Sequence, residues 1–69
     1  MGLRQSGTIK MWKDDKGYGF IRPDGGGQDV YAHISGFGGA PRDPVKGDKV
    51  EYTLTMEDRG PRAEEISFA

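Results

Sequence analysis

Apolar and polar positions alternate over short segments of this chain, which is the pattern of half-buried β-strands. Between residues 49 and 56 every second residue is apolar, namely Val50, Tyr52, Leu54 and Met56. Successive side chains of a strand point to opposite faces, so these four would share one face. We expect five strands and no helix, with the strands over residues 7–13, 16–22 or 18–22, 29–33, 49–56 and 62–68.

The last of these segments is irregular, because its apolar residues Ala63 and Ile66 have opposite parity. A β-bulge near Glu64 or Glu65 would bring both side chains to one face. Tight turns are expected at 14–17, 23–28 and 59–61, which carry Gly, Asp and Pro. The connection 35–48 is longer, contains Gly and Pro and lacks a helical period, so we expect a mobile loop there.

Five short strands with one long connection between the third and the fourth predict a closed sheet. Closure removes the exposed strand edges that would otherwise invite aggregation. The fold class that fits is all-β, a five-stranded antiparallel OB-fold Greek-key barrel. A chain of 69 residues allows a single domain, 1–69, with the N-terminal domain of a longer protein as the alternative. We expect a monomer, with a dimer as the alternative.

Flat rings alternate along the second and third predicted strands. Tyr18 and Phe20 share one parity in the second strand, and Tyr31 and His33 do so in the third. We call the surface formed by these four rings the aromatic face. The opposite parity holds small or aliphatic residues suited to a core, namely Gly19, Ile21, Val30 and Ala32. So small a barrel cannot bury both faces, so we interpret the rings as a stacking surface for unpaired bases rather than as core.

Charge is distributed unevenly, although the net charge is only −1. Four basic and two acidic residues lie from Thr8 to Arg22, whereas five basic and seven acidic residues follow from Ile34 onward. The half that carries the rings is therefore the basic half. This weak asymmetry predicts a modest affinity for nucleic acid, few phosphate contacts and a shallow salt dependence.

Several other functions are disfavoured by composition. The chain has no cysteine and one histidine, so neither a disulfide nor a metal site is expected. His33 has no nucleophile placed with it, so we expect no enzyme activity and no cofactor. No apolar run approaches the ~18 residues of a membrane span, and the first residues lack the apolar region of a signal peptide. We therefore expect a cytoplasmic protein without membrane contact.

Four runs of this sequence resemble, in order and spacing, the bacterial cold shock domain. They are Gly-Thr-Ile-Lys at 7–10, Asp-Lys-Gly-Tyr-Gly-Phe-Ile at 15–21, Asp-Val-Tyr-Ala-His-Ile-Ser at 29–35 and Gly-Pro-Arg-Ala at 60–63. The second and third runs are similar to that family's RNP1 and RNP2 motifs. The resemblance implies a barrel that binds single-stranded RNA and DNA with low selectivity, as an RNA chaperone or a stress-linked regulator. It assigns binding to Lys10, Lys16, Tyr18, Phe20, Tyr31 and His33.

The chain departs from that family after Lys10. The family usually has Trp-Phe-Asn there, and this chain has Met11-Trp12-Lys13. In a regular strand Trp12 would share the parity of Lys10 and join the aromatic face, with Met11 in the core. The alternative is a local bulge that buries Trp12. Lys13 would add a phosphate contact.

Two further stacking positions of the family are altered. Ile34 replaces a common Phe, and Gly39-Ala40-Pro41-Arg42 lacks the loop aromatic, so Phe37 is the candidate loop contact. We read Lys46, Arg59 and Arg62 as solvated charges. The predicted nucleic-acid-binding residues are Lys10, Trp12, Lys13, Lys16, Tyr18, Phe20, Tyr31, His33 and Phe37. A protein-interaction OB module with a weakened nucleic-acid surface is the alternative function.

Overall fold

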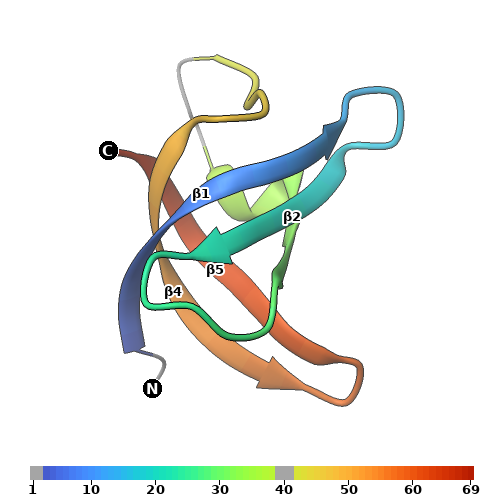
Figure 1. Cartoon of the computed structure of the whole chain (residues 1–69). Helices are drawn as coiled ribbons and strands as arrows, with labels where there is room; N and C mark the ends of the chain where they lie inside the picture. Colours follow the sequence, from blue (N-terminus) through green and yellow to red (C-terminus); the bar gives the residue numbers. More distant parts are fainter. Residues whose placement is uncertain (1–2, 39–41) are drawn as a thin grey trace.

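The computed structural model describes residues 3–38 and 42–69, and these form five strands and one short 3-10 helix (Figure 1). The elements are β1 (Leu3–Lys13), β2 (Tyr18–Pro23), β3 (Val30–His33), η1 (Ile34–Phe37), β4 (Lys49–Glu57) and β5 (Gly60–Phe68). The strands close into a barrel in the order β1-β2-β3-β5-β4. The predicted all-β, five-stranded OB-fold barrel is confirmed.

The expected antiparallel arrangement is wrong for one pair of strands. β3 pairs with β5 in parallel, through Tyr31 with Arg62 and Ala32 with Ala63, whereas the other neighbouring pairs are antiparallel. The reason is arithmetic: an odd number of strands cannot alternate in direction all the way around a closed ring. The parallel pair joins strands separated along the chain by η1 and β4, and a parallel pair needs such a long crossover connection.

β1 is longer than expected, since it begins at Leu3 rather than at Gly7. Its first half pairs with β4, for example Ser6 with Glu51, and its second half pairs with β2, for example Thr8 with Arg22. The early residues are mostly polar, so no apolar alternation marked them as a strand. β1 thus pairs with two neighbours, β2 and β4, in the closed barrel.

Two bulges adjust the register of the sheet. In β1 the pairing passes from Ile9 with Ile21 to Met11 with Phe20, which leaves Lys10 as an extra residue. In β5 the extra residue lies between Glu64 and Ser67, where Glu65 has a positive φ of 50°. The predicted bulge near Glu64 or Glu65 is confirmed, and it explains how Ala63 and Ile66 both reach the core.

The core fills the barrel with residues from every strand and from η1. The buried apolar residues are Ile9, Ile21, Val30, Ala32, Phe37, Val50, Tyr52, Ala63 and Ile66. Tyr52 is completely buried, and burial raises the pKa of its hydroxyl. Within the described residues that hydroxyl has no hydrogen-bond partner, so Tyr52 acts in the core mainly as an apolar ring.

The connection after β3 contains the helical turn η1, where the sequence pattern predicted a loop and no helix. The amide of Ser35 donates a 3.1 Å hydrogen bond to Nδ1 of His33, which caps this turn. A four-residue turn is too short for an apolar period to reveal it. Positions 39–41 of the predicted loop lie outside the described residues.

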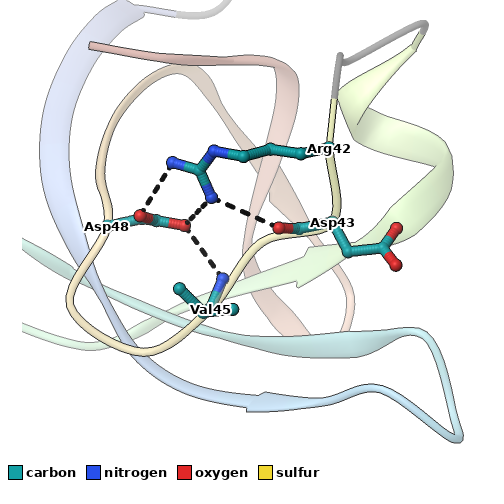
Figure 2. Close-up of polar contacts among 4 residues, drawn as sticks. All are labelled: Arg42, Asp43, Val45 and Asp48. Carbon is teal, nitrogen blue, oxygen red and sulfur yellow. Dashed lines mark hydrogen bonds and ion pairs between the residues drawn. The ribbon is translucent and has the colours of Figure 1, made fainter.

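An arginine clamp ties the rest of this connection to the barrel (Figure 2). Arg42 donates two hydrogen bonds to Asp48, from Nη1 to Oδ2 at 2.8 Å and from Nη2 to Oδ1 at 2.9 Å. The amide of Val45 donates to the same carboxylate at 2.9 Å. The guanidinium also lies 4.1 Å from the ring centroid of Phe68. The segment 42–48 is therefore anchored at both of its ends.

The clamp also sets the ionisation of the carboxylate. Hydrogen bonds from Arg42 hold the pKa of Asp48 below its ordinary value, with the Val45 amide acting in the same direction. A lowered pKa in the folded protein means that ionised Asp48 stabilises the fold. This stabilisation is present above the ordinary pKa of 3.8 and is lost as the pH falls through the lower, folded value.

Replacing Gly19 by alanine is expected to destabilise the barrel by roughly 1–3 kcal/mol, because a Cβ there has no room. It would meet the carbonyl oxygen of Met11 and lie 2.7 Å from Cε3 of Trp12. Urea denaturation would measure the loss. Gly25→Ala is the matched control, since a Cβ at Gly25 meets nothing within 4 Å. Equal stability of the two variants would contradict the close approach of β1 to Gly19.

The Asp48→Asn variant is expected to be less stable than the wild type at pH 7, and the difference should shrink as the pH falls below about 4. Denaturant midpoints measured from pH 2 to pH 7 would show this convergence. Asp43→Asn removes the same charge, but its carboxylate points away from the clamp in Figure 2, so its midpoint should stay near the wild-type value. A gap for Asp48→Asn that is constant with pH would rule out a stabilising ionised carboxylate.

Candidate functional site

The structure brings the four rings of the aromatic face together on the outside of the barrel. Tyr18 of β2 lies opposite His33 of β3, and Phe20 lies opposite Tyr31. The burial of both strands alternates residue by residue, so the rings are partly exposed while Ile21, Val30 and their neighbours are buried. The predicted division into an outer aromatic face and an inner core face is confirmed.

Three of the rings contact one another and support one another's orientation. The ring centroids of Tyr18 and Tyr31 are 5.8 Å apart, and those of Phe20 and Tyr31 are 6.0 Å apart. Tyr18 and Phe20 meet edge to face at 6.4 Å. Such contacts restrain the rings before any ligand arrives, which reduces the entropy lost on binding.

His33 is held by its neighbour Ser35. The Ser35 amide donates to Nδ1, and the Ser35 hydroxyl oxygen lies 2.9 Å from the same nitrogen. Because Nδ1 accepts from a backbone amide, the neutral ring carries its proton on Nε2. The ring is therefore fixed in place with its Nε2–H group left to donate a hydrogen bond.

The three predicted lysines differ in their surroundings. Nζ of Lys10 forms a 2.8 Å ion pair with Asp29, at the entrance to β3. Lys13 lies opposite Tyr18 at the end of β1, and Lys16 is exposed in the following turn. Among residues 3–38 and 42–69, neither Lys13 nor Lys16 forms an ion pair. These two cations lie at the His33 end of the aromatic face.

The prediction that Trp12 lies on the aromatic face is wrong. The bulge at Lys10 reverses the parity of β1, so Trp12 lies opposite Gly19. Gly19 is a buried position on the inner face of β2. The Trp12 ring packs against the core and meets Phe37 edge to face at 5.6 Å. The alternative of a bulge that turns Trp12 inward is the one that the structure bears out.

Phe37 also differs from its predicted role as a loop contact. Its side chain is only 5% exposed and belongs to the core. The ring lies between Trp12 and Phe68, whose centroid is 5.7 Å away. Phe37 thus helps to fill the barrel, because η1 turns the chain inward directly after His33.

Two apolar residues missed by the parity argument lie beside the rings. Met11 lies directly opposite Phe20, and such opposite residues share a face of the sheet. Ile34 is 39% exposed, and its amide donates to the carbonyl of Gly17, next to Tyr18. The family resemblance already placed a stacking Trp at the position of Met11, and this was the signal that could have found it.

An open groove of about 530 Å³ borders the aromatic face on the side of the β4–β5 turn. It is lined by Phe20, Tyr31 and the β4–β5 turn at 57–62. Cζ of Arg62 lies 5.6 Å from the ring centroid of Tyr31, and its Nε lies 3.0 Å from Oε1 of Glu64. Arg59 and Arg62, read from the sequence as solvated charges, therefore flank the rings.

The described part of the chain contains no group of three His, Cys, Asp or Glu side chains that could hold a metal ion. Its only helix, η1, is far too short to cross a membrane. The candidate site is a surface of rings with Lys13 and Lys16 at one end and Arg59 and Arg62 beside Phe20 and Tyr31.

Comparisons with known proteins agree with this geometry. Residues 5–69 match the model of the 'Cold-shock' DNA-binding domain family. The chain is 43% identical over 65 residues to "Cold shock protein ScoF" of Streptomyces coelicolor, covering 93% of this chain and 97% of that one. It is 41% identical over 66 residues to "Cold shock-like protein CspA" of Stigmatella aurantiaca, covering 88% and 91% of the two chains.

A solved structure, "drosophila Unr CSD456", superposes with a TM-score of 0.82 at 25% sequence identity. The superposition covers 99% of this chain and 27% of that one. The barrel is thus also similar to one part of a longer protein.

Proposed function

The chain belongs to the cold-shock DNA-binding domain family, a family of nucleic-acid-binding proteins, and we propose that its aromatic face captures unpaired bases of single-stranded RNA and DNA. The observation that carries this proposal is the alternating burial of β2 and β3. Aromatic rings are normally buried. In β2 and β3, however, four rings occupy the outer positions, while small or aliphatic residues occupy the inner positions. Unpaired bases are the ligands that such a surface fits.

In this proposal the binding surface consists of Tyr18, Phe20, Tyr31 and His33. Each base that stacks on a ring contributes about 1–3 kcal/mol. Met11 and Ile34 add apolar contact but present no flat ring, so they support stacking less well. His33 adds a hydrogen-bond donor at Nε2. Trp12 and Phe37 face the core and are not part of the surface.

Phosphate contacts are proposed at the two ends of this surface. Lys13 and Lys16 lie at the His33 end, and Arg59 and Arg62 lie beside Phe20 and Tyr31. To meet a phosphate, Lys10 would have to leave Asp29 and Arg62 would have to leave Glu64, and this exchange offsets part of the gain of each. We therefore expect modest affinity with a shallow dependence on salt.

The proposed mechanism needs neither catalysis nor a cofactor. A protein that binds only the open form of a hairpin shifts its equilibrium toward melting without ATP. One chain carries the whole aromatic face, so a monomer suffices. This behaviour is that of an RNA chaperone, and it suits a stress-linked regulator in the cytoplasm.

Truncation of Phe20 is expected to weaken single-strand binding at least tenfold with little loss of fold, because its ring is half-exposed and central to the surface. Fluorescence anisotropy with a labelled pyrimidine oligonucleotide would measure the affinity of Phe20→Ala, and urea denaturation would confirm folding. Phe20→Leu keeps apolar volume without a flat ring, so it should bind nearly as weakly. Wild-type affinity in a folded Phe20→Ala protein would favour the protein-interaction module instead.

The wild-type protein is expected to lower the melting temperature of a short RNA hairpin as its concentration rises, without ATP. The physical reason is mass action, since only the open strand exposes bases to the rings. A hairpin labelled with a fluorophore and a quencher would report the melting. A folded Phe20→Ala protein at equal concentration serves as the control and should leave the melting temperature nearly unchanged. A hairpin stabilised by the protein would refute the mechanism.

A further inference from the structure

A second groove lies beyond the Phe20 end of the aromatic face. It encloses about 310 Å³ and is lined by Thr8, Ile9, Lys10, Arg22, Lys46 and Gly47. Three of its six lining residues are cations, and none is acidic. We call it the cationic groove. In a chain whose net charge is −1, this is a local excess of positive charge.

The backbone places this groove on the same side of the sheet as the rings. Arg22 follows Phe20 by two residues in β2, so both side chains leave the same face. Thr8 lies directly opposite Arg22 in β1 and shares that face. A single strand of nucleic acid that stacks on Tyr18 and Phe20 and continues along β2 would reach Arg22 next.

The turn before β4 forms the opposite wall. The amide of Gly47 donates to the carbonyl of Ile9 at 2.8 Å, and the amide of Ile9 donates to the carbonyl of Asp48 at 2.8 Å. These two bonds hold Lys46 beside β1. The Arg42–Asp48 clamp anchors the same turn, so the position of Lys46 is set by the fold.

The cations of the groove differ in how far they are neutralised. Lys10 is paired with Asp29, and to reach it from β1 its side chain crosses β2. The nearby carboxylates of Asp24 and Asp48 are taken by Lys49 and Arg42. Within residues 3–38 and 42–69, Arg22 and Lys46 have no acidic partner, so their charges remain available to an anion.

We propose that Arg22 and Lys46 form an anion subsite that takes a backbone phosphate of the bound single strand. This inference rests on the proposed function, and it gives the ligand a path: bases stack on the aromatic face, and the backbone then passes Lys10 into the cationic groove. The guanidinium of Arg22 can donate two parallel hydrogen bonds to a phosphate, whereas Lys46 acts as a point charge. Thr8 lines the same groove, and its hydroxyl is a further hydrogen-bond donor there.

The salt dependence of binding tests this subsite. Each phosphate of a single strand that the protein neutralises contributes about 0.7 to the slope of log K against log salt concentration. Because Arg22 and Lys46 share one phosphate in this proposal, the double variant Arg22→Gln/Lys46→Gln is expected to lower the slope by about 0.7, and each single variant by a part of that amount. Arg4→Gln is the matched control, because it removes an equal charge that donates to the hydroxyl of Ser67 and lies outside the groove. Its slope should equal that of the wild type.

A second measurement uses the unaltered protein. Oligonucleotides with one uncharged methylphosphonate linkage, placed at each position in turn, should reveal a linkage whose neutralisation weakens the wild type. The same linkage should have little effect on the Arg22→Gln/Lys46→Gln protein, because the contact is already absent.

The outcomes separate this inference from the proposed function. Wild-type slopes in both groove variants, or an equal drop for Arg4→Gln, would overturn the subsite while Phe20-dependent binding still supports the proposed function. Absence of single-strand binding by the wild type, even at low salt, would overturn both. A lowered slope confined to the groove variants, with a sensitive linkage, would establish the subsite.

Discussion

The limited interior of the barrel is the constraint on which the rest of this structure depends. A chain of 69 residues closes five strands around one core, and each strand can bury only one of its faces there. In β2 and β3 the inner positions are taken by small and aliphatic residues such as Ile21 and Ala32. The rings between them must therefore remain outside, where they face solvent and any ligand.

The same constraint explains the irregularities of the strands. Five strands cannot alternate around a ring, so β3 and β5 run parallel where the barrel closes. Bulges accommodate the strong curvature of so small a barrel. One of them lies in β1, where Lys10 is the extra residue. This bulge turns Trp12 to the inner side, where its ring packs against Phe37, and leaves Met11 beside Phe20. One inserted residue thus decides which side chains a ligand can meet.

For charge as well, the local placement of the side chains matters more than the net charge of the chain. The net charge of −1 does not suggest a polyanion as ligand. Yet several carboxylates are occupied by cations of the chain itself, as Asp48 is by Arg42 and Asp24 is by Lys49. Among the described residues, Lys13 and Lys16 form no such pair and border the rings at one end, and the cationic groove lies beyond the other. The cationic groove is therefore a locally positive region of a chain whose net charge is slightly negative.

The sequence by itself determined the fold class, the five strands and the aromatic face, because alternation with period two directly encodes which side of a strand is buried. It also located the bulge near Glu65, since Ala63 and Ile66 could not otherwise share the core. Tertiary structure alone decided the positions of Trp12 and Phe37, because the bulge at Lys10 and the turn η1 leave no periodic trace. It likewise decided which cations of the described residues have an acidic partner, since the partners of Lys10 and Lys49 lie on segments that meet only when the barrel forms.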